Sequence, residues 1–279
     1  MERDDYRQAS HATWEAMAPG WERWRAQLED NAAPIREWMV ARLAAKPGDT
    51  VLELSAGAGD TGFDVAAKLG NDGSLISSDF AAEMVEVARR RGDELGLENV
   101  DYRVIDAENI DLDDNSVDGV LCRWGYMLMA DPAAALAETR RVLRPGGRLV
   151  LSVWGTPEQN PWGSVVGRFL VQNGHMPAPE PGAPGVFSMA NEARTRGMLE
   201  DAGFQNVETA EIGVRFVFQD LDDYLSWAVN TAGALAIVLR GLSEEERAGL
   251  EAEVEAAFVP YAADGGYEVP GWALNAVAS

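Results

Sequence analysis

Between Thr50 and Trp154, short apolar runs alternate with segments in which apolar residues recur at helical spacing. This alternation predicts parallel strands joined by right-handed crossover helices. An α/β sheet of this kind binds ligands at the carboxyl ends of its strands, so the residues that follow each strand are the first to consider. The strands are expected over residues 51–54, 74–78, 100–105, 117–122 and 148–153, with helices beginning near Thr61, Ala82 and Pro132.

The segment before the first strand is predicted to be helical. Pro19-Gly20 is expected to interrupt any single long helix, so two shorter helices are predicted. We therefore expect an N-terminal helical cap over residues 1–46, followed by an α/β domain over residues 47–279. The second helix has its apolar positions on one face, at Ile35, Trp38, Met39 and Leu43.

Beyond Trp154 the alternation becomes irregular. Residues 155–189 are rich in Pro, Gly and Trp and are expected to form a lid, because they are too apolar for a simple connector. A helix is predicted near 192–202 and a strand over 207–218. A helical insertion over about 220–262 precedes a last strand at 272–278. This insertion can serve as a lid or as a dimer surface, since it offers apolar area at Leu235, Ile237, Val238 and Leu239.

The glycine-rich turn after the first strand indicates a nucleotide-like ligand. Residues 57–62 satisfy G-x-G-x-x-G, and Asp79 ends the second strand, where a carboxylate can accept hydrogen bonds from ribose hydroxyls. Both features fit NAD(P) as well as S-adenosylmethionine, so an NAD(P)-dependent oxidoreductase is one alternative. Glu53, inside the first strand, favours S-adenosylmethionine, which carries an ammonium and a sulfonium in place of a pyrophosphate.

Four motifs follow one another at the strand ends. They are Val51–Gly59, Ser78–Phe80 with Met84 on the next helix, Asp106–Glu108, and Arg141–Leu149. Together they resemble the class I S-adenosylmethionine-dependent methyltransferases, in particular the branch related to ubiquinone and menaquinone biosynthesis. The resemblance covers roughly residues 14–154. It implies a Rossmann-like fold with a seven-stranded, mostly parallel sheet and an antiparallel last strand.

The resemblance also implies which residues bind the cofactor, whose product is S-adenosylhomocysteine. Gly57 and Gly59 would give the methionine moiety access to the backbone, and Asp79 would hold the ribose. Asp106 would accept from the adenine amino group, and Arg123 would sit beside the transferred methyl. The complete set of expected cofactor contacts is Trp21, Glu53, Ser55, Gly57, Gly59, Asp79, Phe80, Met84, Asp106, Ala107, Glu108 and Arg123.

The methyl acceptor is expected to be a small, aromatic or hydrophobic molecule. Methyl transfer is an in-line displacement that depends on alignment, so no fixed catalytic triad is required. If the acceptor is a hydroxyl, a base helps, and the two histidines, His11 and His175, are the candidates. A non-catalytic S-adenosylmethionine-binding regulatory protein is the second alternative. The expected acceptor pocket is aromatic: Trp14, Trp124, Tyr126, Trp154 and Trp162.

Charge and cysteine content restrict the partners. A formal net charge of −23 opposes nucleic acid and acidic membrane surfaces. The single Cys excludes an internal disulfide, no Cys or His cluster has zinc spacing, and no apolar run is long enough to span a bilayer. We therefore expect a metal-free, cytoplasmic protein, monomeric or homodimeric, whose partner is a small-molecule methyl acceptor.

Overall fold

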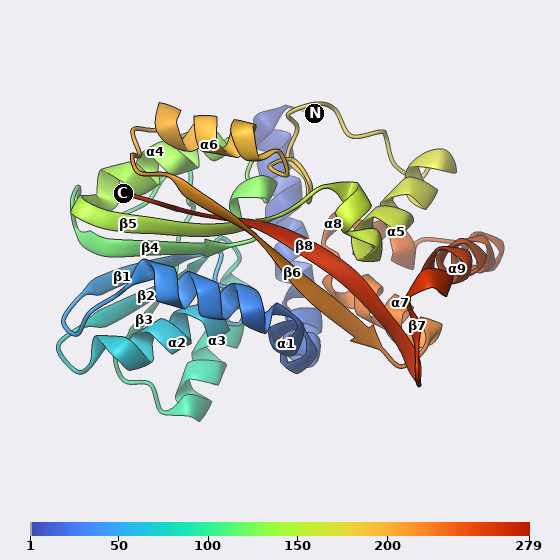
Figure 1. The fold of residues 1–279 in the computed structure, drawn as a ribbon, viewed down its shortest axis with the longest axis horizontal. Helices are drawn as coiled ribbons and strands as arrows, with labels where there is room; N and C mark the ends of the chain where they lie inside the picture. Colours follow the sequence, from blue (N-terminus) through green and yellow to red (C-terminus); the bar gives the residue numbers. More distant parts are fainter. Residues whose placement is uncertain (1) are drawn as a thin grey trace.

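One mixed sheet organises the computed structural model, which describes residues 2–279 (Figure 1). The strands run in the order β3-β2-β1-β4-β5-β8-β6, and the short β7 pairs with β8 at its outer end. Their bounds are β1 Thr50–Leu54, β2 Ser74–Asp79, β3 Val100–Val104, β4 Val117–Arg123, β5 Leu143–Trp154, β6 Glu208–Phe218, β7 Ala262–Ala263 and β8 Gly266–Ala278.

The first five strands form the parallel part of the sheet. Strand β1 pairs in parallel with both β2 and β4, so the strand order reverses between β1 and β4. Strands β8 and β6 then add in antiparallel orientation beside β5. The predicted mostly parallel sheet with an antiparallel last strand is confirmed. The reversal point is where α/β sheets of this kind open a crevice for ligands.

The helices surround the sheet in two groups. Helices α2, α3 and α4 are the crossovers between parallel strands, whereas α5, α7, α8 and α9 gather around the far ends of β6 and β8 (Figure 1). The predicted insertion over 220–262 is indeed helical. The bounds are α2 Asp60–Leu69, α3 Ala82–Leu95, α4 Pro132–Val142, α5 Pro161–Gln172, α6 Glu192–Asp201, α7 Leu221–Thr231, α8 Ala234–Arg240 and α9 Glu244–Phe258, with 3-10 turns η1 Tyr126–Leu128, η2 Pro157–Gln159 and η3 Val259–Tyr261.

Helix α1 is a single helix, Arg3–Leu43, of 41 residues. The prediction that Pro19-Gly20 divides it is therefore wrong. A proline inside a helix removes one N–H donor, and contacts elsewhere can offset this loss. Here the helix is held at that point by α7, which approaches so closely that a Cβ on Gly20 would overlap the carbonyl oxygen of Asn230. The helix ends at Leu43, and the next residue, Ala44, takes a left-handed conformation with φ 53°.

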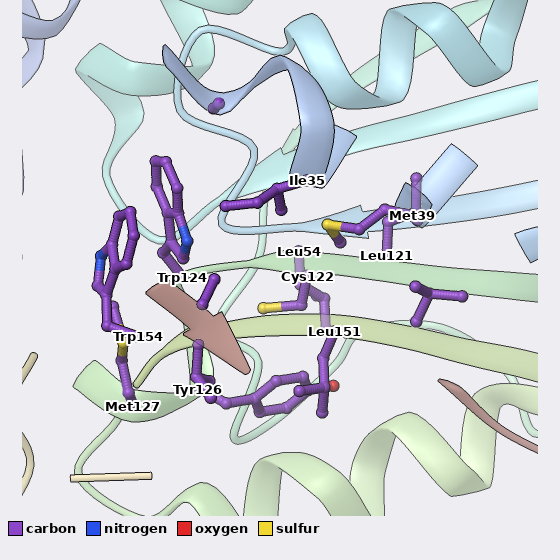
Figure 2. Packing of buried hydrophobic residues seen from close by; sticks show 14 of the residues in the cluster. Ile35, Met39, Leu54, Leu121, Cys122, Trp124, Tyr126, Met127, Leu151 and Trp154 are labelled. Carbon is purple, nitrogen blue, oxygen red and sulfur yellow. The ribbon is translucent and has the colours of Figure 1, made fainter. Parts of the chain in front are cut away.

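The second half of α1 packs into the main core. Ile35 and Met39 of α1 are fully buried against Leu54, Leu121 and Leu151, which come from β1, β4 and β5 (Figure 2). Burying an aliphatic side chain of this size contributes about 1.5–3 kcal/mol to folding. The core therefore fixes one half of α1 against the sheet, while the other half extends toward the strand ends.

Two strands begin five or six residues earlier than predicted. Strand β5 begins at Leu143 instead of 148, because Leu143 already pairs with Val117 across the expected turn. Strand β8 begins at Gly266 instead of 272, because β6 offers it pairing partners from Glu208 to Phe218. Both extensions depend on a neighbouring strand that local sequence does not reveal.

Within residues 2–279, no helix is both long enough and apolar enough to cross a membrane.

The close packing at Gly20 can be tested by substitution. We expect Gly20→Ala to lower the free energy of unfolding by about 1–3 kcal/mol, because the added methyl group overlaps the α7 backbone. Gly167→Ala is the matched control, since Gly167 lies in α5 with open space around its Cβ position. There alanine should raise stability by about 0.5–1 kcal/mol. Urea denaturation of both variants measures the difference, and equal effects would contradict the packing argument.

Candidate functional site

The predicted cofactor residues meet at one edge of the sheet. Asp79 is the last residue of β2, Arg123 is the last residue of β4, and Asp106 follows β3 directly after Ile105. The loop of residues 55–59 follows β1. Because these four strands are parallel, their carboxyl ends lie at the same edge.

The loop after β1 has a strained backbone that is joined to β2. Ser55, Gly57 and Gly59 all have positive φ angles, of 54°, 55° and 85°. Residues other than glycine rarely take this conformation, so Ser55 is strained. The Gly57 amide donates to Asp79 Oδ2 at 3.0 Å, and the Ala81 amide donates to Oδ1 at 3.0 Å. Asp79 therefore holds the loop in addition to facing the edge where the ribose is expected.

Glu53 lies beneath the first turn of α2. Its Oε1 accepts from the Gly62 amide at 2.8 Å, and a Cβ on Gly62 would overlap its Oε2. The side chain is buried, which raises the pKa of its carboxyl, and Oε2 has no hydrogen-bond partner in the described part of the chain. Glu53 therefore supports the helix start behind the glycine loop.

The first half of α1 crosses the strand ends. Arg7 pairs with Asp106 and also with Glu108, whose Oε2 lies 2.7 Å from Nη1. The Asp131 amide donates to the other oxygen of Glu108 at 3.1 Å. A polar cavity of about 250 Å³ borders Arg7 and Glu108 at this end of α1. The two acids expected at the adenine thus already face an arginine.

Two further contacts attach α1 to the end of β2. The His11 ring lies edge-on to Phe80, with centroids 4.9 Å apart. The Glu15 carboxylate accepts from the amides of Ala82 and Glu83, at 2.8 and 3.2 Å, and so caps the start of α3. A carboxylate at a helix N-terminus is stabilised by the helix dipole.

The Trp21 ring packs against the glycine loop. Its ring carbons lie 3.6 Å from where a Cβ on Gly57 would stand, and its Nε1 donates to the Thr231 carbonyl at 3.1 Å. Trp14 lies edge-on to it, with ring centroids 5.8 Å apart. Both rings join a small apolar cluster that includes Met84. Trp14 therefore belongs with the cofactor loop and is separate from the aromatic residues after β4.

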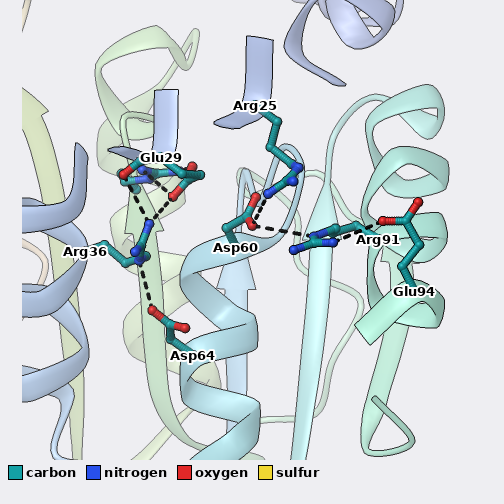
Figure 3. A network of polar contacts seen from close by, with 8 residues as sticks. Arg25, Glu29, Arg36, Asp60, Asp64, Arg91 and Glu94 are labelled. Carbon is teal, nitrogen blue, oxygen red and sulfur yellow. Dashed lines mark hydrogen bonds and ion pairs between the residues drawn. The ribbon is translucent and has the colours of Figure 1, made fainter. Parts of the chain in front are cut away.

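A set of ion pairs, buried at Glu29 and Arg123, joins α1 to α2 and β4 (Figure 3). Glu29 pairs with Arg123 and, at 2.8 Å, with Arg36. Arg36 reaches Asp64 of α2 at 2.9 Å, and Arg25 reaches Asp60 at 2.9 Å. Sequence reasoning missed this network, although Arg25, Glu29 and Arg36 follow one another at helical spacing on one face.

The neighbouring arginines determine the protonation state of Glu29. Burial alone would raise the pKa of Glu29, but the charges and hydrogen bonds of Arg123 and Arg36 outweigh burial and lower it. Glu29 is therefore a carboxylate at neutral pH. Arg123, expected beside the transferred methyl, is held by this carboxylate with only 9% of its side chain exposed.

Three of the five predicted pocket aromatics lie together. The Trp124 and Trp154 rings stack with centroids 4.5 Å apart and an interplanar angle of 23°, and Trp162 lies 4.8 Å from Trp154. Tyr126 does not join them: it is fully buried, and its hydroxyl bonds Thr139 Oγ1 at 2.6 Å on the α4 side (Figure 2). The prediction that Tyr126 lines the pocket is wrong, because the 3-10 turn η1 directs its ring into the core.

The two histidines lie elsewhere. His11 contacts Phe80 and Glu15, and His175 lies 3.5 Å from Glu246 beside the Phe169 ring. Neither contact involves the residues after β4, where the transferred methyl is expected. The geometry therefore gives neither histidine a position as the base. Among residues 2–279, no group of three or more His, Cys, Asp or Glu side chains could hold a metal ion.

The segment that forms this edge of the sheet is similar to known proteins. A family profile described as a methyltransferase domain matches residues 45–172. The demethylmenaquinone methyltransferase of Thermus thermophilus is 32% identical over 143 residues, which are 51% of this chain and 59% of that protein. The ubiquinone/menaquinone biosynthesis C-methyltransferase UbiE of Francisella philomiragia is 28% identical over 181 residues, covering 61% of this chain and 72% of that protein. Residues 45–172 thus match a methyltransferase domain, in agreement with the class I resemblance of the four motifs.

The methyltransferase domain confirms the family and the cofactor, S-adenosylmethionine, that the four motifs predict. A solved structure, the YcgJ protein of Bacillus subtilis, shares the fold over 87% of this chain and 96% of its own, with a TM-score of 0.57 and 20% identity. The chain spans 37%, 59% and 48% of the length of three curated relatives. The role of each site residue stays a prediction, as do the cap and lid boundaries.

The buried pair of Glu29 and Arg123 predicts a large effect of charge removal. Glu29→Gln leaves the Arg123 guanidinium buried without its counter-charge and should lower the free energy of unfolding by about 3–5 kcal/mol. Glu22→Gln is the matched control. Glu22 lies on α1, like Glu29, and pairs with Arg90 of α3 at 2.9 Å, but that pair is exposed and screened by solvent. Urea denaturation at neutral pH should show a much smaller loss for the control.

The same pair predicts the pH dependence of this loss. Because the folded pKa of Glu29 lies below its ordinary value of 4.5, its stabilisation is complete above pH 4.5 and is lost as the pH falls through the folded pKa. The difference in stability between wild type and Glu29→Gln should therefore shrink on acidification. A difference that grows at low pH would contradict the ion pair.

Proposed function

We propose that this protein transfers the methyl group of S-adenosylmethionine to a small aromatic molecule. The observation that carries the proposal is the junction of Gly57 with Asp79, in which a left-handed glycine turn is hydrogen-bonded to the acid that ends the next parallel strand. The matched methyltransferase domain spans this junction. The alternative of a non-catalytic binding protein has no separate observation in its favour.

The residues at the junction suit S-adenosylmethionine better than a dinucleotide. Gly57 and Gly59 give the loop its left-handed turns, and Asp79 offers carboxylate oxygens for vicinal hydroxyls. Glu53 and Asp60 lie beside the loop, and burial raises the pKa of both carboxyls, so further negative charge is unfavourable there. A pyrophosphate would add such charge, whereas the ammonium and sulfonium of S-adenosylmethionine would stabilise the ionised carboxylates.

The remaining cofactor contacts follow the strand ends. In this proposal Trp21 covers the methionine moiety, Phe80 and Met84 contact the adenine side, and Asp106 accepts from the adenine amino group. Ala107 and Glu108 border the ring, and Ser55 shapes the loop. These roles are supported by the common position of the residues at the carboxyl ends of the strands. Helix α1 also runs along these ends, from Arg7 beside the end of β3 to Glu29 beside the end of β4.

The acceptor is a flat, hydrophobic molecule in this proposal. Support comes from the tryptophans that gather after β4 and β5, and from relatives named for quinone biosynthesis. A net charge of −23 opposes nucleic acid as a substrate. When bound, S-adenosylmethionine supplies an electrophilic methyl group. The protein's part is to align the acceptor for in-line attack and to exclude water, and α1 is placed across the strand ends to do so.

Calorimetry distinguishes this function from an oxidoreductase. We expect S-adenosylhomocysteine to bind and NADH to give no heat of binding, because the loop is flanked by acids. Incubation with methyl-labelled S-adenosylmethionine and a panel of phenols, amines and acids then tests transfer. NADH binding without S-adenosylhomocysteine binding would overturn the proposal, and cofactor binding without product for any acceptor would favour the non-catalytic protein.

Asp79 gives the sharpest single-residue test of the cofactor site. We expect Asp79→Ala to weaken S-adenosylhomocysteine binding by about 1–3 kcal/mol, roughly 5- to 150-fold, through loss of the ribose hydrogen bonds. Asp101→Ala on β3 is the matched control, since its carboxylate pairs with Arg103 on the surface. Calorimetry at one ionic strength compares the two. Equal affinities of Asp79→Ala and wild type would place the cofactor elsewhere.

A further inference from the structure

Trp124 combines two unfavourable features at the end of β4. Its backbone has φ 62°, a left-handed conformation that a bulky residue rarely adopts. Its amide donates to the Ser152 carbonyl of β5 at 2.7 Å, so the backbone is held in place. The next residue, Gly125, lies so close to Ser55 that a Cβ there would overlap the Ser55 hydroxyl. The strained backbone of Trp124 therefore lies where the loops after β1 and β4 are in close contact.

The Trp124 side chain is fixed between two neighbours. The Arg123 guanidinium lies 4.7 Å from its ring centroid, and Trp154 stacks on it at 4.5 Å. Arg123 is itself held by Glu29 of α1. The indole therefore contacts residues of β4 and β5 directly and is linked to α1 through Arg123.

The second unfavourable feature is an unsatisfied donor. Trp124 is 8% exposed, and its Nε1–H is buried without any acceptor among the residues that the structure describes. Two neighbouring indoles do have acceptors: Trp162 donates to Asn160 Oδ1 at 3.0 Å, and the half-buried Trp21 donates to the Thr231 carbonyl. A buried donor without a partner is unfavourable, and strain at the same residue is typical of a functional position.

We infer that Trp124 positions the methyl acceptor by donating a hydrogen bond from Nε1–H to an oxygen atom on an aromatic ring. The acceptor class is thereby narrowed to planar molecules that carry a phenolic or carbonyl oxygen. This inference rests on the proposed function. Trp227 is the internal comparison, because its Nε1–H also lacks a partner, yet it lies in the regular helix α7 without backbone strain.

Indole NMR signals give a direct test in the protein saturated with S-adenosylhomocysteine. The chain has nine tryptophans, and each indole N–H gives one resonance, so loss of a signal in Trp124→Phe identifies that of Trp124. The probes are 2-naphthol and naphthalene, which differ in one hydroxyl. We expect 2-naphthol to move the Trp124 resonance and naphthalene to leave it nearly unchanged. The Trp227 resonance should not move with either probe.

Affinities provide the second readout. Trp124→Phe keeps an aromatic ring and removes the donor, so it should weaken 2-naphthol binding by about 10-fold and leave S-adenosylhomocysteine affinity unchanged. Trp227→Phe should change neither affinity. The inference is overturned if 2-naphthol binds without moving the Trp124 resonance, if Trp124→Phe binds it as tightly as wild type, or if 2-naphthol fails to bind. Failure of S-adenosylhomocysteine to bind is a separate result, which overturns the proposed function.

Discussion

The ion pair between Glu29 and Arg123 sets the arrangement of the whole ligand edge. Both side chains are almost fully buried, and a charge in that environment is tolerated only when its partner is present. The pair therefore determines where α1 lies relative to β4. Through Arg36 and Asp64 it is also linked to α2, and through the guanidinium it contacts the Trp124 ring. Helix α1, helix α2 behind the glycine loop and the Trp124 ring are thus all linked to this one ion pair.

The parallel sheet and its acids were predictable because their signals are local. Each strand is a short apolar run, and parallel pairing brings the residue after each run to one edge whatever the helices do. Asp79 and Asp106 therefore appear where the motifs place them. The glycines at 57 and 59 were equally informative, since their left-handed backbone is a property of the loop itself.

The features that sequence reasoning missed or misplaced depend on contacts between distant segments. Pro19 continues a helix because α7 packs against the neighbouring Gly20, more than 200 residues away in the chain. Tyr126 points into the core, where its hydroxyl forms a hydrogen bond with Thr139 of α4. Arg123 pairs with a glutamate on α1 that no motif marks. Pairing and packing of this kind override local propensity.

The two prolines of α1 have a mechanical consequence. Pro19 and Pro34 lack the amide hydrogens that would bond the carbonyls of Glu15 and Asp30, so the helix has two gaps in its backbone ladder. Its first stretch is attached to the ends of β2 and β3, its middle to the glycine loop and β4, and its last to the core. A tertiary or side-chain contact lies at each gap: α7 packs on Gly20 beside Pro19, and Arg36 pairs with Glu29 across Pro34. The helix is therefore continuous through both prolines only because the folded protein supplies these contacts in place of the missing backbone hydrogen bonds.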